Sequence, residues 1–193
     1  MRTIFLFAAF ALLAACERQP APPEPPGNEA NNAVETPDIA VQGIDRRQAG
    51  RMAPETAFTD PDGGEVRLAD FEGTPVLVNL WASWCAPCVK ELPTLDALAR
   101  SRRVDGDLMV IAVSQDNGPP ASVRAFLDKA GAKYLAAYRD PAMGLSGALN
   151  SQVLPTSVLY DAHGREVWRY VGDLDWESDT AVKLLGEGAT AGN

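Results

Sequence analysis

Two cysteines stand three residues apart in Trp84–Pro93, WCAPCVKELP. Cys85 follows a continuous apolar run, and a helical pattern begins at Ala86, so we expect Cys85 at a helix N-terminus. The partial positive charge and unpaired N–H groups at that end stabilise a thiolate and lower the cysteine pKa. Cys88 lies one turn into the helix and should be shielded. The spacing therefore predicts thiol–disulfide exchange, in which Cys85 attacks a partner's disulfide and Cys88 resolves the mixed disulfide.

Other uses of a cysteine pair fit this chain less well. A structural zinc site takes four ligands, but the only histidine, His163, lies in the turn DAHG and there is no second cysteine pair. A disulfide that closes so short a loop removes little unfolded-state entropy. We therefore expect no metal and no cofactor beyond the redox-active disulfide Cys85–Cys88. A Cu(I) ion held by the two reduced thiolates stays open as an alternative.

The N-terminus predicts export. MRTIFLFAAFALLAAC has one positive charge at Arg2 and an apolar run of 12 residues, Ile4–Ala15. A membrane-spanning helix needs about 20 residues, whereas a secretory signal has this shorter layout. The motif LAAC resembles the bacterial lipobox, so residues 1–15 are expected to be removed and Cys16 to be lipidated. An ordinary signal or an uncleaved anchor is the alternative, and the choice between inner and outer membrane is open.

Residues 16–50 are predicted to form a flexible, proline-rich linker. The stretch ERQPAPPEPPGNEANNAVETP holds six prolines and almost no large apolar side chain, so it cannot bury enough surface to offset the entropy of ordering. Residues 51–187 then form the folded domain, and residues 188–193 a flexible tail. The formal net charge of −9 argues against nucleic acid as a partner.

Within the domain, buried strands alternate with amphipathic helices. This order predicts an α/β fold with a central mixed sheet flanked by helices. The expected elements are a hairpin at 58–68, a buried strand at 75–81, a helix at 86–101, a strand at 107–114, a helix at 119–131, a strand at 133–140, a short helix at 141–150, a hairpin at 155–172 that turns at 161–164, and a last helix at 176–185.

Two motifs carry a family resemblance. VLVNLWASWCAPCVKELP resembles the active-site segment of thioredoxin-fold proteins, and most of all that of the TlpA/ResA-like (DsbE-like) membrane-anchored thiol–disulfide oxidoreductases, with their pattern W-C-x-P-C-x-x-E-x-P. QVLPTSVLYDAHGREV resembles the cis-proline segment of that family. The resemblance covers about residues 53–187. It implies a thioredoxin-like fold with an N-terminal β-hairpin and a helix–strand insertion at about residues 119–138.

The resemblance also implies a substrate-binding surface. Pro155, in the cis form, would lie against the cysteine pair, and the main chain of Leu154 would pair with an extended partner chain. Trp84 would cover the disulfide, Trp81 would fill core, and Pro93 would kink the helix. The substrate-binding residues implied in this way are Trp84, Ala86, Pro87, Leu154, Pro155 and Thr156.

Glu91 is the implied proton carrier. It lies three residues after Cys88 on the same helical face. Cytoplasmic thioredoxins instead place an aspartate six residues before the first cysteine, and that position is Asn79 here, which cannot titrate. Glu91, with a pKa raised by partial burial, would take up and return the Cys88 proton. The alternative is a solvent-facing glutamate that favours the helix dipole.

Together these features predict an extracytoplasmic reductase of disulfides in exported proteins. By resemblance, a membrane thiol carrier would supply electrons, and apocytochrome c or a copper-site assembly protein would be the substrate. A disulfide oxidase or isomerase is the alternative, because the dipeptide Ala86–Pro87 influences the redox potential without fixing it. Trp176 and Glu177 receive no role from the sequence.

Overall fold

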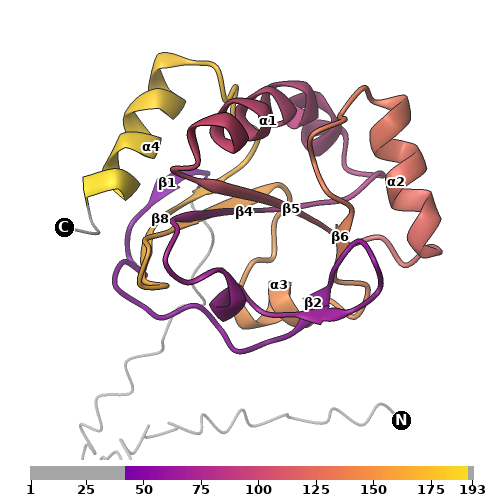
Figure 1. The fold of residues 1–193 in the computed structure, drawn as a ribbon, viewed down its shortest axis with the longest axis horizontal. Coiled ribbons are helices and arrows are strands. Elements are labelled where there is room, and N and C mark those ends of the chain that lie inside the picture. The colour runs from indigo at the N-terminus through magenta and orange to yellow at the C-terminus, as the bar shows by residue number, and fades with distance from the viewer. Residues whose placement is uncertain (1–41, 191–193) are drawn as a thin grey trace, which may run out of the picture. The chain divides into compact units, whose positions relative to one another are not determined.

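The computed structural model describes residues 42–190, which fold around one eight-stranded sheet (Figure 1). The strands lie in the order β1-β8-β7-β4-β5-β6-β2-β3. The strands are β1 (Gly43–Asp45), β2 (Phe58–Thr59), β3 (Glu65–Val66), β4 (Val76–Trp81), β5 (Met109–Ser114), β6 (Tyr138–Arg139), β7 (Thr156–Tyr160) and β8 (Glu166–Val171). The helices are the 3-10 helix η1 (Leu68–Phe71), α1 (Ala86–Asp105), α2 (Pro120–Lys129), α3 (Gly144–Ala148) and α4 (Asp179–Thr190).

The sheet is mixed, as the sequence predicts. The central strand β4 runs parallel to β5 and antiparallel to β7. All six of its residues are buried, which explains why VLVNLW reads as a continuous apolar run with a single polar residue. Because successive side chains of a strand point to opposite faces, Leu77, Asn79 and Trp81 share one face while Val76 and Leu80 share the other.

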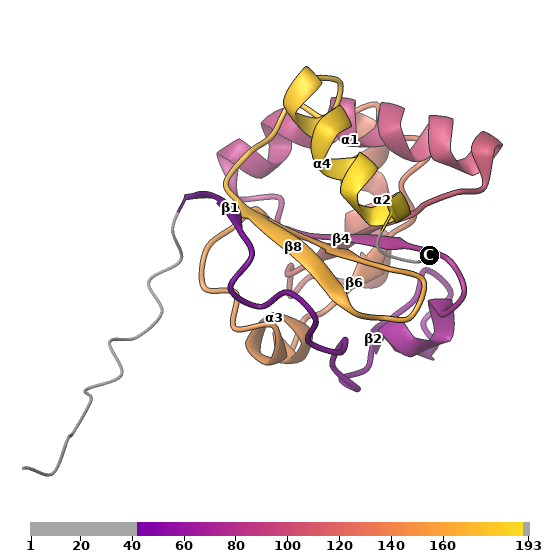
Figure 2. The same ribbon diagram turned by 90° about the vertical axis from the view of Figure 1, so that its left-hand side faces the viewer.

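Each face of the sheet has its own core. Figures 1 and 2 show α1 and α4 on one side of the sheet and α3 on the other. The first core joins the sheet to α1, α2 and α4, and includes both cysteines with Trp168. The second core lies under α3 and η1 and includes Ile111. Two packed layers therefore hold β4 rigid, and the active-site segment follows directly from its carboxyl end.

Helix α1 begins and ends where the chemistry of the sequence dictates. Cys85 is its N-cap residue, and Pro87 occupies the first turn, where no backbone N–H is needed. The helix ends at Gly106, whose φ of 71° is the left-handed conformation that glycine adopts readily. The helix is thus four residues longer at its C-terminus than the range 86–101 expected from the apolar stripe.

The domain begins earlier than the predicted boundary at residue 51. Strand β1 pairs antiparallel with β8 at the edge of the sheet, with Asp45 opposite Arg169. The Asp45 carboxylate accepts hydrogen bonds from Arg47, which lower its pKa. The expectation of a flexible linker through residue 50 is therefore wrong for this segment, because main-chain pairing and one ion pair order residues that composition alone marks as linker.

The last helix also differs from its predicted range. It spans Asp179–Thr190, so it starts three residues later than expected and continues past the predicted domain end at 187 into the expected tail. Trp176 precedes it in a turn, in which the Asp175 main-chain carbonyl accepts from Ser178 N. The leader, Cys16 and residues 17–41 of the linker lie outside the described residues. Among residues 42–190, no helix combines the length and apolarity needed to cross a membrane.

Candidate active site

The cysteine pair lies at the point where β4 leads into α1. Cys85 and Cys88 are joined by a disulfide, with 2.06 Å between the sulfur atoms. Cys85 Sγ accepts a hydrogen bond from Cys88 N at 3.3 Å, so the sulfur takes the place of a helix-capping oxygen. Cys88 is fully buried, whereas Cys85 retains 6% exposure and follows an exposed tryptophan. Of the two cysteines, Cys85 is therefore the one with surface exposed to solvent, and Cys88 is shielded.

The residues around the pair form an exposed rim. Ala86 and Pro87 are exposed at the start of α1. Trp84 is 68% exposed, whereas Trp81 is fully buried in the core as expected. The expectation that Trp84 covers the disulfide stays a prediction, since exposure alone does not fix the position of the ring relative to the sulfur atoms. Trp84 follows β4 in a loop that turns its ring toward solvent, where an incoming protein chain could contact it.

A carboxylate that the sequence did not single out holds this loop. Asp116, which follows β5, accepts hydrogen bonds from Ser83 N at 3.0 Å and Ser83 Oγ at 2.8 Å. The hydroxyl of Ser114 donates to the same carboxylate at 2.7 Å. These bonds tie the residue before Trp84 to the neighbouring strand end. The position of Trp84 and Cys85 thus depends on Asp116.

Glu91 is buried in the first core, with 3% exposure. The alternation of β4 turns Asn79 toward α1, where its Nδ2 donates to Glu91 Oε1 at 2.7 Å and to Ser157 Oγ at 2.9 Å. The other carboxylate oxygen, Oε2, accepts from Leu174 N at 3.1 Å. The alternative of a solvent-facing glutamate does not fit this geometry.

Burial raises the pKa of Glu91 to about 7. The loss of hydration is the largest cause, and it outweighs the hydrogen bonds from Leu174 N and Asn79, which favour the charged form. The Trp176 indole N–H lies beside the carboxylate and lowers the pKa further, although it is outside direct hydrogen-bond geometry. Asp173 acts in the opposite direction through charge repulsion. The carboxyl can therefore gain or lose a proton near neutral pH.

The segment around Pro155 lies beside the segment of the cysteine pair, because β7 and β4 are neighbours in the sheet. The Leu154–Pro155 peptide bond is cis. Thr156 opens β7 opposite Leu80 of β4, near the end of β4 that leads to Cys85. Thr156 Oγ1 donates to Val153 O at 2.7 Å, and Pro155 O accepts from Gly172 N at 2.9 Å. Within residues 42–190, neither main-chain group of Leu154 has a hydrogen-bond partner.

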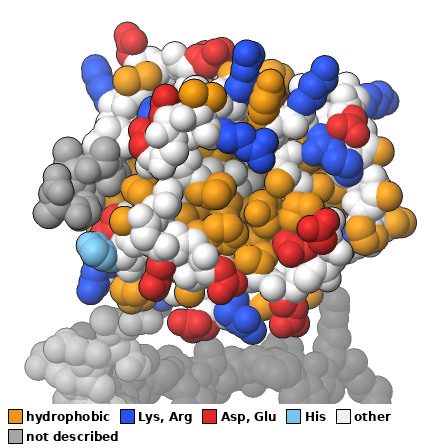
Figure 3. Space-filling view, in the orientation of Figure 1, with side chains coloured by type: hydrophobic (Ala, Val, Ile, Leu, Met, Phe, Trp, Pro, Cys, Tyr) orange, Lys and Arg blue, Asp and Glu red, His pale blue; other side chains and the backbone are white. Residues whose placement is uncertain are grey.

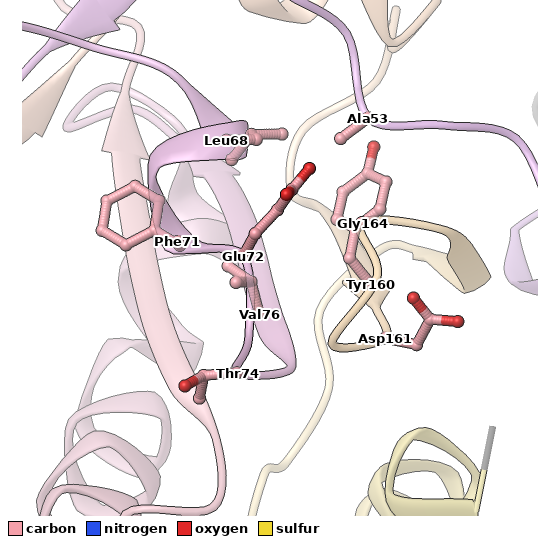
Figure 4. A pocket seen from close by; sticks show the side chains of 9 residues that line it. All are labelled: Ala53, Leu68, Phe71, Glu72, Thr74, Val76, Tyr160, Asp161 and Gly164. Atoms are coloured by element: carbon pink, nitrogen blue, oxygen red, sulfur yellow. The ribbon is translucent and has the colours of Figure 1, made fainter. Parts of the chain in front are cut away.

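Other parts of the described surface offer different chemistry. Figure 4 shows a small pocket at the opposite end of β4, where Glu72 and the Tyr160 hydroxyl point toward one opening while Asp161 points away. The Asp161 carboxylate is used by its own turn, since it accepts from His163 N at 2.9 Å. His163 itself is exposed. Among residues 42–190, no group of three or more His, Cys, Asp or Glu could hold a metal ion.

One face of the domain, shown in Figure 3, gathers apolar side chains at its centre, with basic side chains above them and acidic ones below. A hollow of about 320 Å³ lies beside the carboxyl end of α1 and the start of β5, with Arg102, Arg103, Leu108 and Tyr134 in its lining. It holds neither cysteine. The hollow is therefore separate from the cysteine pair.

A mixed sheet with a capped cysteine pair at the start of a helix, and a cis-proline before the facing strand, defines a thioredoxin-fold thiol–disulfide protein. Comparison with known proteins agrees. The Redoxin family model matches residues 48–185, so the chain belongs to the redoxin family. Thiol-disulfide oxidoreductase ResA of Bacillus thuringiensis (strain Al Hakam) is 33% identical over 129 residues, which cover 67% of this chain and 73% of that protein.

Further relatives point the same way. ResA of Halalkalibacterium halodurans is 29% identical over 127 residues, which cover 66% of this chain and 70% of that protein. A Chlorobium tepidum protein, named as a candidate thiol:disulfide interchange protein DsbE, has a structure that matches with a TM-score of 0.63 and 25% identity, covering 73% of this chain and 97% of that one. The exposed lipoprotein thioredoxin Etrx1 of Streptococcus pneumoniae matches with a TM-score of 0.59 and 27% identity, covering 69% and 99%. The chain is a ResA-like thiol-disulfide oxidoreductase.

Proposed function

We propose that this protein is an extracytoplasmic reductase of disulfides in exported proteins, and that Glu91 carries the proton of its resolving cysteine. The observation that carries the proposal is the burial of Glu91 one helical turn after Cys88, with a pKa of about 7. An ionised Glu91 near neutral pH is a base matched to a thiol proton.

The reaction starts with reduced Cys85, whose thiolate attacks one sulfur of the partner's disulfide. A bond forms between Cys85 Sγ and that sulfur, and the partner's other sulfur leaves as a thiolate. Glu91 then accepts the Cys88 proton, and the Cys88 thiolate attacks Cys85 Sγ. The mixed disulfide breaks, the partner leaves with two reduced sulfurs, and the protein holds the Cys85–Cys88 disulfide. The pair carries the electrons itself, so no further cofactor is proposed.

The residues around the cysteine pair are proposed to bind the partner protein. The exposed rim of Trp84, Ala86 and Pro87 offers apolar contact. The main-chain groups of Leu154 could pair with an extended segment of the partner. Leu154 is held in place by Pro155 and by Thr156, which pairs with Leu80 of β4. A partner whose cysteine pair lies in an extended or unfolded segment fits this surface. Apocytochrome c before haem attachment and copper-site assembly proteins are the two substrate classes we propose.

The proposed setting is the outer side of a bacterial membrane, with Cys16 lipidated. The lipobox-like LAAC supports it, as does the likeness to a Streptococcus pneumoniae protein named an exposed lipoprotein. A thiol carrier in the membrane would return electrons to the oxidised pair. Mass spectrometry of protein extracted from membranes should show acyl mass on Cys16, and an unmodified Cys16 would reject the anchor.

Single-turnover reduction of a disulfide-bonded two-cysteine peptide tests the reaction. The reduced protein should convert the peptide to its dithiol, and Cys88→Ser should trap the peptide on Cys85. Glu91→Gln should slow resolution around neutral pH. Resolution that is equally fast in Glu91→Gln at every pH would reject the proton-carrier role. Anaerobic titration with Cu(I) against a competing chelator separates the alternative, since tighter binding than by a simple dithiol would favour a copper carrier.

A further inference from the structure

A cavity lies between the first turns of α1, where Glu91 stands, and the loop that follows β8. Its volume is about 200 Å³. Glu91 and Leu174 both line it, and Leu174 N donates to the carboxylate oxygen Oε2 of Glu91 at 3.1 Å. A buried acid that turns over protons needs a path to solvent, because a proton moves to bulk water through polar groups and water. The lining residues are Lys90, Glu91, Thr94, Asp173, Leu174 and Asp175.

An ion pair lies across this cavity. Lys90 Nζ donates to Asp173 Oδ2 at 2.7 Å, and thereby joins α1 to the loop after β8. The Lys90 side chain is 77% exposed and that of Asp173 is 32% exposed, so the pair lies at the surface, and both residues line the cavity. Asp173 directly precedes Leu174, whose N–H contacts Glu91, and Lys90 directly precedes Glu91 in the chain. Asp173 is close enough for its charge to act on the buried carboxyl, and Lys90 is bonded to Asp173.

We propose that the ion pair of Lys90 and Asp173 forms an electrostatic gate at the cavity through which Glu91 exchanges its proton with water. This inference rests on the proposed proton-carrier role of Glu91. Asp173 is a positioning residue here, since it acts through Glu91 and does not touch the sulfur atoms.

The gate would act on the proton that Glu91 takes from Cys88. When Glu91 takes the Cys88 proton, the buried carboxyl becomes neutral and the disulfide forms. For the next cycle, the proton must return to Cys88 when the pair is reduced, or leave to water. A negative charge at Asp173 opposes loss of that proton, whereas the positive charge of Lys90 partly cancels the opposition.

Few charged groups surround Glu91, so the effect of each on its proton affinity can be separated by mutation. From the strands, the neutral Asn79 of β4 donates to Glu91, and the same Asn79 amide donates to Ser157 of β7. The ionisable or charged groups come from α1 and from the loop after β8, whose exposed Asp175 also lines the cavity. These groups are Cys85, Cys88, Lys90, Asp173 and Asp175, beside the uncharged donor Trp176.

The test compares two variants that break the same ion pair from opposite sides. Cys85 of the reduced protein is coupled to thionitrobenzoate, and its release by Cys88 is followed by stopped flow across pH. With Asp173→Asn, the pH midpoint of release should fall by a few tenths of a unit, because repulsion on Glu91 is lost. With Lys90→Gln, the midpoint should rise, because Asp173 is left uncompensated. The double variant should resemble Asp173→Asn.

The outcomes separate this gate from the function on which it rests. Midpoints that move in the same direction in both single variants, or in neither, would overturn the gate, since a purely structural ion pair gives equal effects from either side. Glu91→Gln in the same assay reports on the proton-carrier role. A midpoint that vanishes in Glu91→Gln keeps that role even if the gate fails, whereas an unchanged midpoint would reject both.

Discussion

Asn79 and Glu91, twelve residues apart in the chain, are joined in the core by a hydrogen bond of 2.7 Å from Asn79 Nδ2 to Glu91 Oε1. The bond places the carboxyl on the α1 side of the sheet, in the same core as Cys88. The position six residues before the first cysteine thus supplies a hydrogen-bond donor to Glu91, where cytoplasmic thioredoxins have an aspartate. Strand β4 and helix α1 together thus position the carboxyl of Glu91.

Replacing Asn79 should change the proton affinity of Glu91. Asn79→Ala removes a donor that favours the charged form, so the pKa of Glu91 should rise. Asn79→Asp adds a second carboxyl at hydrogen-bond distance, and the two should titrate as a coupled pair with a larger rise. Carbon-13 NMR titration of the glutamate side chains measures the shift. A Glu91 pKa that is the same in all three proteins would contradict this arrangement.

The raised pKa of Glu91 should also be visible as a pH-dependent stability. Its folded value is about 7 against 4.5 for the free side chain, so between these values the folded protein binds more protons than the unfolded chain. Stability should therefore fall as pH rises through this window, and the loss should be complete above it. At about 1.4 kcal/mol per pKa unit, the full loss is on the order of 3 kcal/mol.

Urea unfolding of the oxidised protein at pH 5 and pH 8.5 measures this loss, with Glu91→Gln as the control. The buried Asp140, whose pKa burial also raises, contributes equally to both proteins and cancels in the comparison. The free energy of unfolding should drop further with pH in the wild type than in Glu91→Gln. Parallel pH profiles would mean that Glu91 titrates normally.

Asp116 should control the order of the loop that carries Trp84 and Cys85. Asp116→Ala removes the acceptor of three hydrogen bonds, from Ser83 N, Ser83 Oγ and Ser114 Oγ. The expected loss of stability is about 1–3 kcal/mol, and the Ser83 amide should lose its protection from hydrogen exchange. Asp116→Asn keeps an acceptor oxygen and should retain most of that protection. Equal protection of Ser83 in Asp116→Ala would show that the loop is held by other contacts.

Strand β1 should stabilise the domain although the sequence marks it as linker. A fragment that starts at residue 51 loses the pairing of β1 with β8 and leaves the buried Arg169 without its Asp45 neighbour. We expect it to be less stable than a fragment from residue 42 by about 1–3 kcal/mol. Denaturation by urea compares the two directly. Identical midpoints would restore the predicted boundary at residue 51.

The main elements could be predicted because local patterns specify them. The apolar run before Cys85 is a strand buried on both faces, and the stripe of Leu92, Leu95 and Leu98 is buried under α1. Cys85 as the helix cap follows from the same local pattern. The motif WCAPC together with LPT then predicts the fold around it.

The remainder depends on contacts between distant segments. Leu174, Trp176 and Asp173 surround Glu91 from a loop more than eighty residues away, and no local pattern marks them. The exposure of Trp84 reflects the turn of a loop rather than residue type. Strand β1 depends on an open edge at β8, which the sequence of β1 itself does not reveal.

The reduction potential of the Cys85–Cys88 pair tests the proposed direction of electron flow most directly. The protein from Glu17 onward would be equilibrated in defined thiol–disulfide buffers and the two redox forms quantified. A reductase should have a value near that of thioredoxin, about −270 mV, and would then need an electron donor in the membrane. A value near about −120 mV, typical of a strong disulfide oxidant, would contradict the account and make this protein a disulfide donor.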